Sequence, residues 1–430
     1  MKVGVAGLWH LGTVTAACVA SSGRDVVAFD AASPAIDRLA SGHAPVFEPG
    51  LDELIARGLA DGRLRVSSRT SDLAECDVIW IAYDTPVDEA GRGDVDAVMR
   101  AAAAILPAAR DGCLVLVSSQ LPVGSVRRLE STYQGVRPGG TATFACSPEN
   151  LRLGRALDAF MRPDRVVAGV RQERDRVRIA RLFEPFSERI EWMSVESAEM
   201  TKHALNAFLA TCVTFTNELA VLCERVGADA RDVERGLKSD ARIGSRAYLR
   251  PGGAFAGGTL ARDVAFLLEL GQSERLPAHL MSAVQVSNEA HRAWPRRRLV
   301  EIIGDVVGKS IALLGLTYKA GTDTLRGSTA IEIARWLAER GARVGAYDPA
   351  VRTLPGEYAK FVTLRASAED VLRDADAVVV GTDWPEFAAI SADELVRAMR
   401  SPLVVDPSGF LHAGLGTDAR IRYYSVGRAA

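Results

Sequence analysis

The sequence predicts an α/β protein in which two doubly wound domains are joined by a central helical region with one long helix. Three observations support this fold class. Short β-branched strands alternate with helix-length segments near both ends of the chain, a glycine-rich turn follows the first strand, and the strand signal disappears in the middle. A chain of 430 residues also exceeds one ordinary domain. We expect domains at residues 1–193, 194–295 and 296–430.

The first domain contains a series of apolar runs with the length and composition of strands. Most of them are apolar on both faces, which is typical of parallel strands covered by helices on both sides. In such a sheet, right-handed crossovers place ligands at the carboxyl ends of the strands. The expected strands are Lys2–Ala6, Val26–Phe29, Leu64–Val66, Val78–Ala82, Leu114–Ser118, Thr143–Cys146 and Val166–Val170.

The central region is expected to be helical. Ala198–Val226 has helical periodicity and contains neither proline nor glycine, so it predicts one long helix that could form a dimer seam. Val264–Ala293 is predicted to be helical again. Pro295 and the arginine run after it mark the boundary to the last domain.

The last domain is predicted to be a second α/β unit, without sequence repetition of the first. Each of its strands ends next to a glycine or an aspartate. The expected strands are Ser310–Leu314, Val344–Tyr347, Ala377–Val380 and Leu403–Val405.

Composition limits the kinds of partner that we expect. A net charge of −2, with 48% hydrophobic and 25% charged residues, is typical of a soluble globular protein and indicates neither nucleic acid nor a membrane as partner. No apolar run approaches the roughly 18 residues that span a bilayer. The six cysteines form no CxxC or His/Cys cluster, so we expect no metal site and a reducing, cytoplasmic setting.

A glycine-rich turn from Gly7 to Gly12 (GLWHLG) follows the first strand and opens a helix. In a Rossmann dinucleotide fingerprint the first glycine makes the turn, the second lets backbone approach the pyrophosphate, and the third allows close packing. Trp9 replaces the second glycine. Asp30 ends the second strand, where a carboxylate would hold ribose hydroxyls and disfavour a 2′-phosphate. The turn predicts NAD as cofactor; the alternative is a turn that has lost its dinucleotide.

The loop from Asp240 to Asp263 (DARIGSRAYLRPGGAFAGGTLARD) carries the most specific resemblance to a known family. It resembles the substrate loop of the UDP-glucose/GDP-mannose dehydrogenases, which reads roughly D-x-R-I-G and then P-G-x-G-F-G-G-x-C-x-x-K-D. The cysteine of that family is the catalytic nucleophile. Here Thr259 stands at the cysteine position and Arg262 at the lysine position.

Other segments resemble the same family, in the same order along the chain. They are Phe47–Leu51, Asp84–Pro86, Ser118–Gly124, Ser147–Gly154, Lys202–Ala210 followed by Asn217 and Glu218, and Gly315–Lys319 followed by Asp323, Arg326 and Ser328. On this shared order the chain is identified as a member of the family. The resemblance implies a Rossmann NAD-binding domain, a central dimerisation region and a Rossmann-like domain that binds a nucleotide sugar.

The resemblance also implies catalytic roles. The family oxidises the 6-hydroxyl of a nucleotide sugar twice: the first hydride transfer gives an aldehyde, to which the cysteine thiolate adds. A second hydride transfer converts this adduct into a thioester, which water hydrolyses. Lys202 and Asn206 would stabilise a developing oxyanion from one face of a helix. Asp263 would orient the lysine and a water, Ser119 would help to hold that water, and Glu149 would be the first of a carboxylate pair. Lys202 could instead be a solvated charge, and Asp263 an N-cap of the following helix.

Several departures from the family fall on the thioester stage. The hydroxyl of Thr259 stays protonated near neutral pH unless a base activates it, so it is a far weaker nucleophile than a thiolate. Leu153 replaces the second glutamate of the pair, and Arg262 keeps the charge of a lysine but changes its shape. Cys146 could be a displaced nucleophile, but we interpret it as a buried strand cysteine.

These departures predict an NAD-dependent oxidoreductase that oxidises a UDP-sugar by two electrons and stops at the aldehyde, in a specialised biosynthetic pathway. Two alternatives remain open. The enzyme could perform a redox-neutral epimerisation or rearrangement, or it could be a catalytically silent paralogue that binds a nucleotide sugar.

Binding residues are assigned by the same resemblance. Arg242 would act across a homodimer interface, and Lys319 would reach the substrate from the last domain; His10 substitutes for an aromatic residue of the family. The cofactor set is Gly7, Trp9, His10, Leu11, Gly12, Asp30, Thr85, Pro86, Ser119 and Arg326. The substrate set is Leu151, Arg152, Lys202, Asn206, Arg242, Tyr248, Leu249, Gly252, Phe255 and Lys319.

Overall fold

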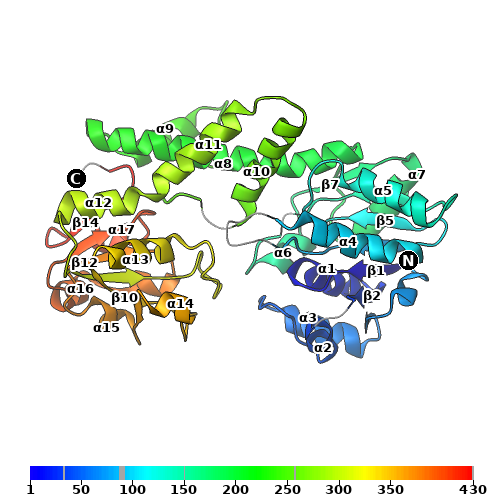
Figure 1. The fold of residues 1–430 in the computed structure, drawn as a ribbon, viewed down its shortest axis with the longest axis horizontal. Helices are drawn as coiled ribbons and strands as arrows, with labels where there is room; N and C mark the ends of the chain where they lie inside the picture. Colours follow the sequence, from blue (N-terminus) through cyan, green and yellow to red (C-terminus); the bar gives the residue numbers. More distant parts are fainter. Residues whose placement is uncertain (32–33, 87–92, 150, 256–257, 429–430) are drawn as a thin grey trace. The chain divides into compact units, whose positions relative to one another are not determined.

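The computed structural model describes residues 1–31, 34–86, 93–149, 151–255 and 258–428. Asn150 of the 147–154 motif and two residues of the glycine-rich loop, 256 and 257, lie outside the described residues. The chain forms two compact units, Met1–Ala204 and Leu205–Ala430, named unit 1 and unit 2 below. Figure 1 shows that each unit has its own sheet with helices on both faces.

Unit 1 contains an eight-stranded sheet in the order β3-β2-β1-β4-β5-β6-β7-β8. All the strands expected from the sequence are confirmed, with ends that differ by a residue at most; the short, half-buried β8 was not foreseen because it carries Glu191 and lacks a clear apolar run. The strands are β1 (Lys2–Ala6), β2 (Asp25–Phe29), β3 (Leu64–Ser67), β4 (Val78–Ile81), β5 (Leu114–Val117), β6 (Thr143–Cys146), β7 (Val166–Val170) and β8 (Ile190–Met193).

The expectation of a wholly parallel sheet is wrong at one place, because β6 and β7 pair antiparallel. Among its described residues, the segment between them holds only the short helix α6 (Ala156–Met161). An antiparallel pair needs no full crossover helix, whereas a parallel pair does. The strands β1 to β6 therefore form the parallel, doubly wound part of the sheet, and the strand direction reverses between β6 and β7.

Helices cover both faces of the unit 1 sheet because successive strand residues point to opposite faces. In β4, for example, Val78 and Trp80 belong to one apolar cluster and Ile79 and Ile81 to the other. The other helices of unit 1 are α1 (His10–Ser21), α2 (Pro34–Ala40), α3 (Leu51–Ala60), α4 (Val95–Ile105), α5 (Ser125–Val136) and α7 (Glu173–Phe183), with 3₁₀ turns η1 (Thr70–Leu73) and η2 (Leu106–Ala108).

The predicted long helix is confirmed as α8 (Val195–Val226), and the boundary between the two units falls inside it. The second predicted helix, Val264–Ala293, is wrong in extent: α10 (Gly258–Ser273) begins earlier and α11 (His279–Arg292) follows after a break. Arg275 adopts φ 57° in this break, which ends a right-handed helix. The neighbouring helices are α9 (Ala230–Ser239) and α12 (Trp294–Ile303).

Helix α8 is long and apolar enough to cross a membrane, judged by length and composition only. Core helices of soluble proteins pass the same test, so this single helix among the described residues is weak evidence for a membrane span. About 44% of its most apolar window is buried inside the protein.

Unit 2 contains a six-stranded parallel sheet in the order β11-β10-β9-β12-β13-β14, which repeats the order of the first six strands of unit 1. The four predicted strands are confirmed; β11 was not predicted because it has only two residues, and β14 because its sequence RYY lacks a buried apolar run. The strands are β9 (Ser310–Leu314), β10 (Arg343–Tyr347), β11 (Thr363–Leu364), β12 (Ala377–Val380), β13 (Leu403–Val405) and β14 (Arg422–Tyr424). The helices are α13 (Thr329–Glu339), α14 (Gly356–Ala359), α15 (Ala368–Leu372), α16 (Ala392–Ala398), α17 (His412–Leu415) and the 3₁₀ turn η3 (Pro385–Ala389).

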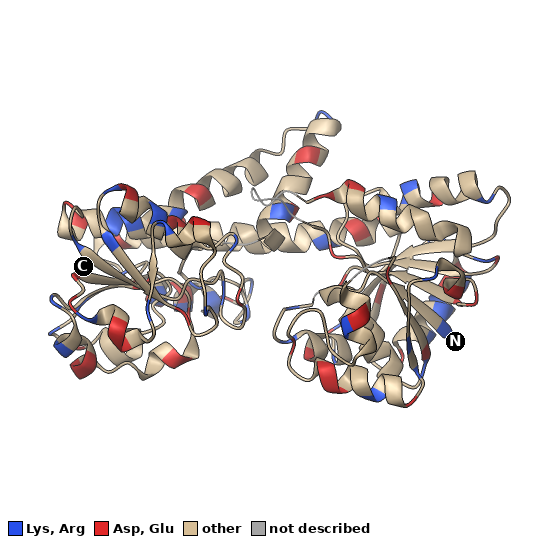
Figure 2. Ribbon diagram, turned by 60° about the horizontal axis from the view of Figure 1, so that its bottom comes forward, with Lys and Arg blue, Asp and Glu red and all other residues tan. Residues whose placement is uncertain are grey.

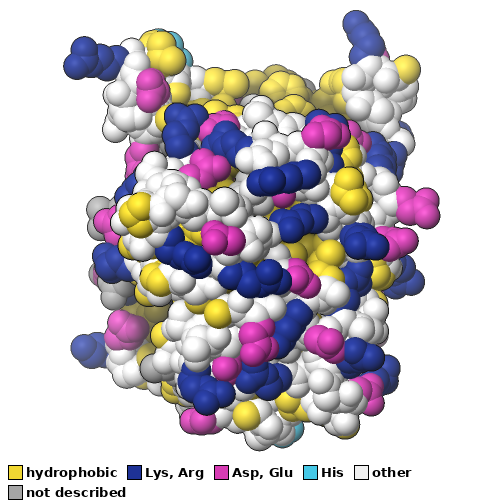
Figure 3. All heavy atoms as spheres, turned by 90° about the vertical axis from the view of Figure 1, so that its right-hand side faces the viewer, with side chains coloured by type: hydrophobic (Ala, Val, Ile, Leu, Met, Phe, Trp, Pro, Cys, Tyr) yellow, Lys and Arg dark blue, Asp and Glu magenta, His cyan; other side chains and the backbone are white. Residues whose placement is uncertain are grey.

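Charged residues lie mainly on helices and loops, and the strands contain few of them (Figure 2). On the face drawn in Figure 3, basic and acidic side chains are interspersed over the surface. This distribution agrees with the small net charge of −2.

Candidate active site

The turn between β1 and α1 requires glycine at two positions. Gly7 has φ +97°, and a Cβ there would lie 2.7 Å from Tyr83. A Cβ on Gly12 would lie 1.6 Å from the carbonyl oxygen of Gly7. Trp9, at the N-cap of α1, has φ −92°, which any residue adopts, and its side chain is 55% exposed. The tryptophan therefore stands at the position of the second glycine without needing a positive φ.

Asp30 follows β2 and contacts the same turn. Its carboxylate accepts hydrogen bonds from the backbone N–H of Leu8 (2.8 Å) and of Ala31 (2.9 Å). Each carboxylate oxygen has a second lone pair, so the half-buried group can still accept ribose hydroxyls. Its position fits the role predicted for it.

His10, the first residue of α1, is held by a buried glutamate. Its Nε2 lies 3.0 Å from Oε2 of Glu48, and Glu48 also accepts from the N–H groups of Gly154 and Ala156 at the start of α6. The sequence motif around Glu48 had pointed to the family but not to this pairing. His10 is therefore fixed beside the glycine-rich turn.

The turn that follows β4 approaches the start of α1. Asp84 Oδ2 accepts a hydrogen bond from the N–H of Leu11, at 3.0 Å. Thr85 is buried and donates to the carbonyl oxygen of Gln120 (2.6 Å), and the carbonyl oxygen of the exposed Pro86 accepts from Asp94 (2.7 Å). The sequence placed this turn near the cofactor but gave no sign of the contact that Asp84 makes.

The residues of this region fit NAD. Gly7 permits the tight turn and Gly12 the close packing of helix on strand, as in a dinucleotide fingerprint, and a carboxylate at the position of Asp30 would disfavour a 2′-phosphate. The negative carboxylate of Asp84 at the phosphate-binding end of α1 is the feature that fits least well. Arg326, the remaining cofactor residue predicted from the sequence, is exposed in the unit 2 loop between β9 and α13.

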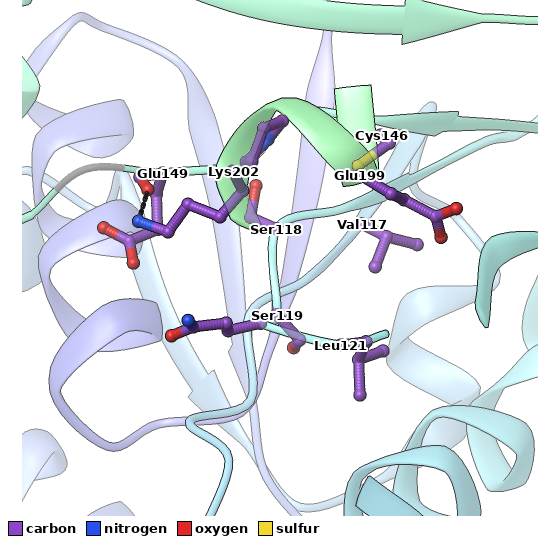
Figure 4. A pocket seen from close by; sticks show the side chains of 10 residues that line it. Val117, Ser118, Ser119, Leu121, Cys146, Glu149, Glu199 and Lys202 are labelled. Carbon is purple, nitrogen blue, oxygen red and sulfur yellow. Dashed lines mark hydrogen bonds between the residues drawn. The ribbon is translucent and has the colours of Figure 1, made fainter. Parts of the chain in front are cut away.

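A small cavity lies at the carboxyl ends of β5 and β6 in unit 1 (Figure 4). Its volume of about 20 Å³ is enough for one water molecule. The hydroxyl of Ser119 is buried there, without a hydrogen-bond partner among the described residues. The cavity is lined by Val117, Ser118, Ser119, Gln120, Leu121, Cys146, Pro148, Glu149, Glu199 and Lys202.

Lys202 and Glu149 meet at this cavity. Lys202 Nζ donates to the carbonyl oxygen of Glu149, as the dashed line in Figure 4 marks. The carboxylate of Glu149 accepts from the N–H of Leu151. Unit 1 thus brings together the predicted lysine, serine and glutamate, and it holds the lysine at the carboxyl end of the sheet rather than as a solvated charge.

Glu199 is a residue of the cavity that sequence reasoning missed. Its buried carboxylate accepts from the N–H groups of Gly124 (2.7 Å) and Val126 (2.9 Å) at the start of α5. Burial raises the pKa of Glu199, although the two backbone hydrogen bonds lower it. Cys146 is also buried, and burial raises the pKa of its thiol well above the usual value, so it is a poor nucleophile.

Unit 2 holds the other part of the predicted catalytic set. Asp263 is fully buried on α10 and accepts a hydrogen bond from Asn206 Nδ2 on α8. Because α10 begins at Gly258, Asp263 lies within the helix and the alternative N-cap role is wrong. Asn206 follows Lys202 by one turn of α8, on the same face.

Thr259 is the second residue of α10 and is exposed. It precedes Asp263 by one turn, so the two lie on the same face of the helix. A helix N-terminus lowers the pKa of a cysteine thiol but leaves a threonine hydroxyl protonated.

Side chains from α8 and α11 hold the glycine-rich loop before α10. Asn217 accepts from the N–H of Gly252 (3.0 Å), and His291 Nε2 donates to its carbonyl oxygen (2.8 Å). Asn288 pairs with both backbone groups of Phe255, at 2.9 and 3.0 Å. Sequence reasoning missed Asn288 and His291, because nothing in their local pattern marks them as partners of a distant loop.

The remaining predicted substrate residues are distributed over both units. Leu151 packs against the apolar core of unit 1, and Arg152 is exposed. In unit 2, the exposed Arg242 is bound to Asp240 (2.7 Å), and Lys319 Nζ lies 5.7 Å from the centre of the Tyr318 ring.

Tyr248 and Leu249 complete this set in the loop before the glycines. Tyr248 is 58% exposed, whereas Leu249 is buried. The assignments of all these residues to the substrate stay predictions.

Comparison with protein families gives three matches in chain order. Residues 1–187 match the NAD binding domain of the UDP-glucose/GDP-mannose dehydrogenase family. Residues 196–290 match its central domain, and residues 312–413 match its UDP binding domain.

Curated proteins and solved structures agree with these matches. The chain is 35% identical over 439 residues to a UDP-glucose 6-dehydrogenase of Rhizobium meliloti and 33% identical over 433 residues to one of Bacillus subtilis, with at least 98% of each chain covered. A UDP-glucose dehydrogenase from Pyrobaculum islandicum has a similar structure, with a TM-score of 0.88, 30% identity, and coverage of 100% of this chain and 98% of that one. A UDP-D-ManNAc dehydrogenase from Pyrococcus horikoshii gives 0.86 at 26% identity, covering 100% and 99%. The chain therefore belongs to the UDP-glucose/GDP-mannose dehydrogenase family, whose members are NAD-dependent dehydrogenases of nucleotide sugars.

Proposed function

We propose that the protein oxidises the 6-hydroxyl of a UDP-sugar by two electrons and releases the aldehyde. The observation that carries this proposal is Thr259, which stands where the family has its nucleophilic cysteine. Bound NAD would accept the hydride from C6, so one alcohol and one NAD become one aldehyde, one NADH and one proton.

Retained residues support the first oxidation. The ammonium of Lys202 and the amide of Asn206 lie one turn apart on α8 and could both donate to the oxygen that loses its proton. Asp263, fully buried, accepts from Asn206 and thereby fixes the direction of its amide. Ser119 offers a buried hydroxyl beside a water-sized cavity.

Substituted residues argue against the second oxidation. A thioester needs a thiolate, and the exposed Thr259 hydroxyl has far lower nucleophilicity. Leu153 takes away the second carboxylate that would activate the hydrolytic water. The aldehyde would then leave the site before a second hydride transfer.

The test is to incubate the enzyme with UDP-glucose and NAD and to count NADH per sugar, with the product identified by mass spectrometry after trapping with hydroxylamine. We expect one NADH per sugar and a trapped aldehyde. Thr259→Ala should retain this activity, Thr259→Ser serves as the matched control, and Thr259→Cys combined with Leu153→Glu should begin to form uronate. Two NADH per sugar with uronate from the unmodified protein would refute the proposal.

The alternatives are separated by the same experiment. A redox-neutral epimerisation or rearrangement would give no net NADH, with NAD that copurifies with the protein. A silent paralogue is favoured by Trp9 and by Asp84 at the phosphate end of α1. It would show no thermal shift with NAD, because a ligand of the native state must stabilise it.

The protein is also proposed to be a cytoplasmic homodimer with functional regions at 1–193, 194–295 and 296–430. Phe208, Phe215 and Leu222 support the dimer, since they recur every seven residues on α8 and are 67%, 52% and 62% exposed. Replacing one of these apolar side chains by a charged one, as in Phe215→Glu, should then give a monomer in light scattering. The three regions lie close to the ranges of the three family matches.

A further inference from the structure

The carboxylate of Asp84 lies at the start of α1, where a dinucleotide-binding turn normally holds the pyrophosphate of the cofactor. Its carboxylate accepts the N–H of Leu11, the second residue of α1, at 3.0 Å. The N–H groups of the first helical turn have no partner within the helix. In a dinucleotide-binding turn these donors and the positive end of the helix dipole face the pyrophosphate.

A carboxylate at this point opposes the cofactor through its charge. The pyrophosphate of a dinucleotide is a dianion, and like charges in contact distance repel more strongly in a partly buried site than in water. The surrounding turn otherwise has the form of a dinucleotide-binding turn, because Gly7 and Gly12 permit its tight backbone and Asp30 stands at the ribose position. The site thus combines a dinucleotide cradle with an internal anion at its phosphate end.

The aspartate is not needed at this point by the turn itself. Unit 2 repeats the Asp-x-Pro turn after β12, as Asp383-Trp384-Pro385. There the aspartate accepts from the hydroxyl of Ser408 (2.6 Å), while the N–H groups of Leu316 and Thr317 donate to Asp348. The same local sequence therefore forms with its own aspartate, Asp383, bound to a serine hydroxyl, while a different aspartate, Asp348, accepts from the backbone of the neighbouring turn.

We propose that Asp84 is a positioning residue that closes the phosphate-binding end of α1 in the free protein, and that a dinucleotide binds only when this carboxylate leaves the Leu11 N–H. The inference rests on NAD as the cofactor of the proposed function. Because the closed state must open first, the observed affinity for NAD is lower than the turn alone would provide.

The test is calorimetric titration of the full-length protein with NAD, ADP-ribose and adenosine. Asp84→Asn removes the charge but keeps an acceptor for Leu11, and Asp84→Ala removes both. The matched control is Asp229→Asn, since Asp229 caps α9 in unit 2 through the N–H of Arg231 (2.8 Å). We expect both Asp84 variants to lower the dissociation constants of NAD and ADP-ribose by about tenfold, equal to about 1.4 kcal/mol.

Adenosine separates this role from a merely structural one. It carries no phosphate, so its affinity should stay unchanged in the Asp84 variants, and Asp229→Asn should change none of the three affinities. Unchanged or weaker NAD binding in both Asp84 variants would overturn the proposal, as would an equal gain for adenosine or no NAD binding by any variant. If Asp84→Ala fails to fold, Asp84→Asn decides alone.

The outcome is independent of how far the oxidation proceeds. The proposed function fails when two NADH are formed per sugar, which leaves the measured affinities untouched. The Asp84 proposal fails on the affinities, whatever product is formed.

Discussion

The two α/β sheets contain the same turn with opposite consequences. After β1, Gly7 (φ +97°) donates its N–H to Phe29, and after β9, Gly315 (φ +90°) donates to Tyr347, at 3.0 and 2.8 Å. In each case the next residue donates to an aspartate that comes after the neighbouring strand, Asp30 or Asp348. Both turns thus have the backbone of a nucleotide-binding turn.

The two turns differ in the distance along the chain to the next helix and in how much of the aspartate remains accessible. In unit 1, α1 begins at His10, directly after the turn, whereas α13 in unit 2 begins only at Thr329. Asp30 is half-buried, while Asp348 is 1% exposed. Asp348 accepts from the N–H groups of Leu316, Thr317 and Ala350, the hydroxyl of Thr317 and the indole N–H of Trp384.

The glycine turn by itself therefore does not make a cofactor site. A dinucleotide needs the positive N-terminus of a helix beside the turn and a carboxylate that can still accept hydrogen bonds. Unit 1 offers both, whereas the aspartate of unit 2 holds its own loop. The difference can be tested by substitutions in the two units.

The largest effect is expected from Gly12→Ala. Its Cβ would lie 1.6 Å from the Gly7 carbonyl oxygen, and the backbone cannot yield there, so unit 1 should lose about 3 kcal/mol of stability and all NAD binding. Gly381→Ala, whose Cβ would lie 2.6 Å from the Gly315 oxygen, should destabilise unit 2 but leave NAD binding intact. Urea unfolding and calorimetric titration measure the two effects.

Gly135→Ala is the matched control for these variants, because its Cβ on α5 would meet nothing within 4 Å. It should stabilise the protein slightly, by about 0.5–1 kcal/mol, since alanine favours a helix over glycine. Retained NAD binding by Gly12→Ala would show that the close approach in the turn is unnecessary.

An intermediate effect separates the two aspartates. Asp348→Ala leaves its buried donors without an acceptor and should cost about 3 kcal/mol of stability. Asp30→Ala should cost about 1 kcal/mol of stability but weaken NAD binding about tenfold and reduce the preference for NAD over NADP. Equal losses of stability in the two variants would contradict the difference in burial.

The smallest effect is a difference in pH dependence between the units. Burial lowers the pKa of His291 in unit 2, so the unfolded chain takes up a proton first, and unit 2 should lose stability as the pH falls below about 6.5. Burial raises the pKa of Glu199 in unit 1, so the folded form takes up a proton first as the pH falls from neutrality. That stability is complete below about pH 4.3 and is lost as the pH rises through the raised pKa.

As the pH falls from about 6.5 to about 4.3, the ordinary pKa values of histidine and glutamate, the two groups should therefore shift the stabilities of their units in opposite directions. Hydrogen exchange, analysed separately for unit 1 and unit 2, measures this. His291→Gln and Glu199→Gln should each remove the shift of their own unit only. A parallel shift of both units that survives both substitutions would show that other groups dominate.

Much of the site could be predicted from the sequence, although in pieces. The two required glycines, the aspartate after β2 and the replacement of the family cysteine by Thr259 are all visible in the chain. The structure assembles Lys202, Ser119 and Glu149 at one cavity and pairs Asn206 with Asp263. The extent of α10 was mispredicted, and this removed the capping role considered for Asp263.

The sequence by itself determined where most of the strands lie, where glycine is obligatory and that a threonine stands at the position of the family's cysteine. These properties depend on side-chain type and on neighbours close in the chain, through β-propensity, burial on both faces and backbone sterics. Only the tertiary structure decided that Asp84 bonds to Leu11, that Asp348 is buried while Asp30 is half-exposed, and that Asn288 and His291 hold the glycine-rich loop. Such contacts join residues far apart in the chain, and they form only once the packing of sheets and helices has brought these residues together.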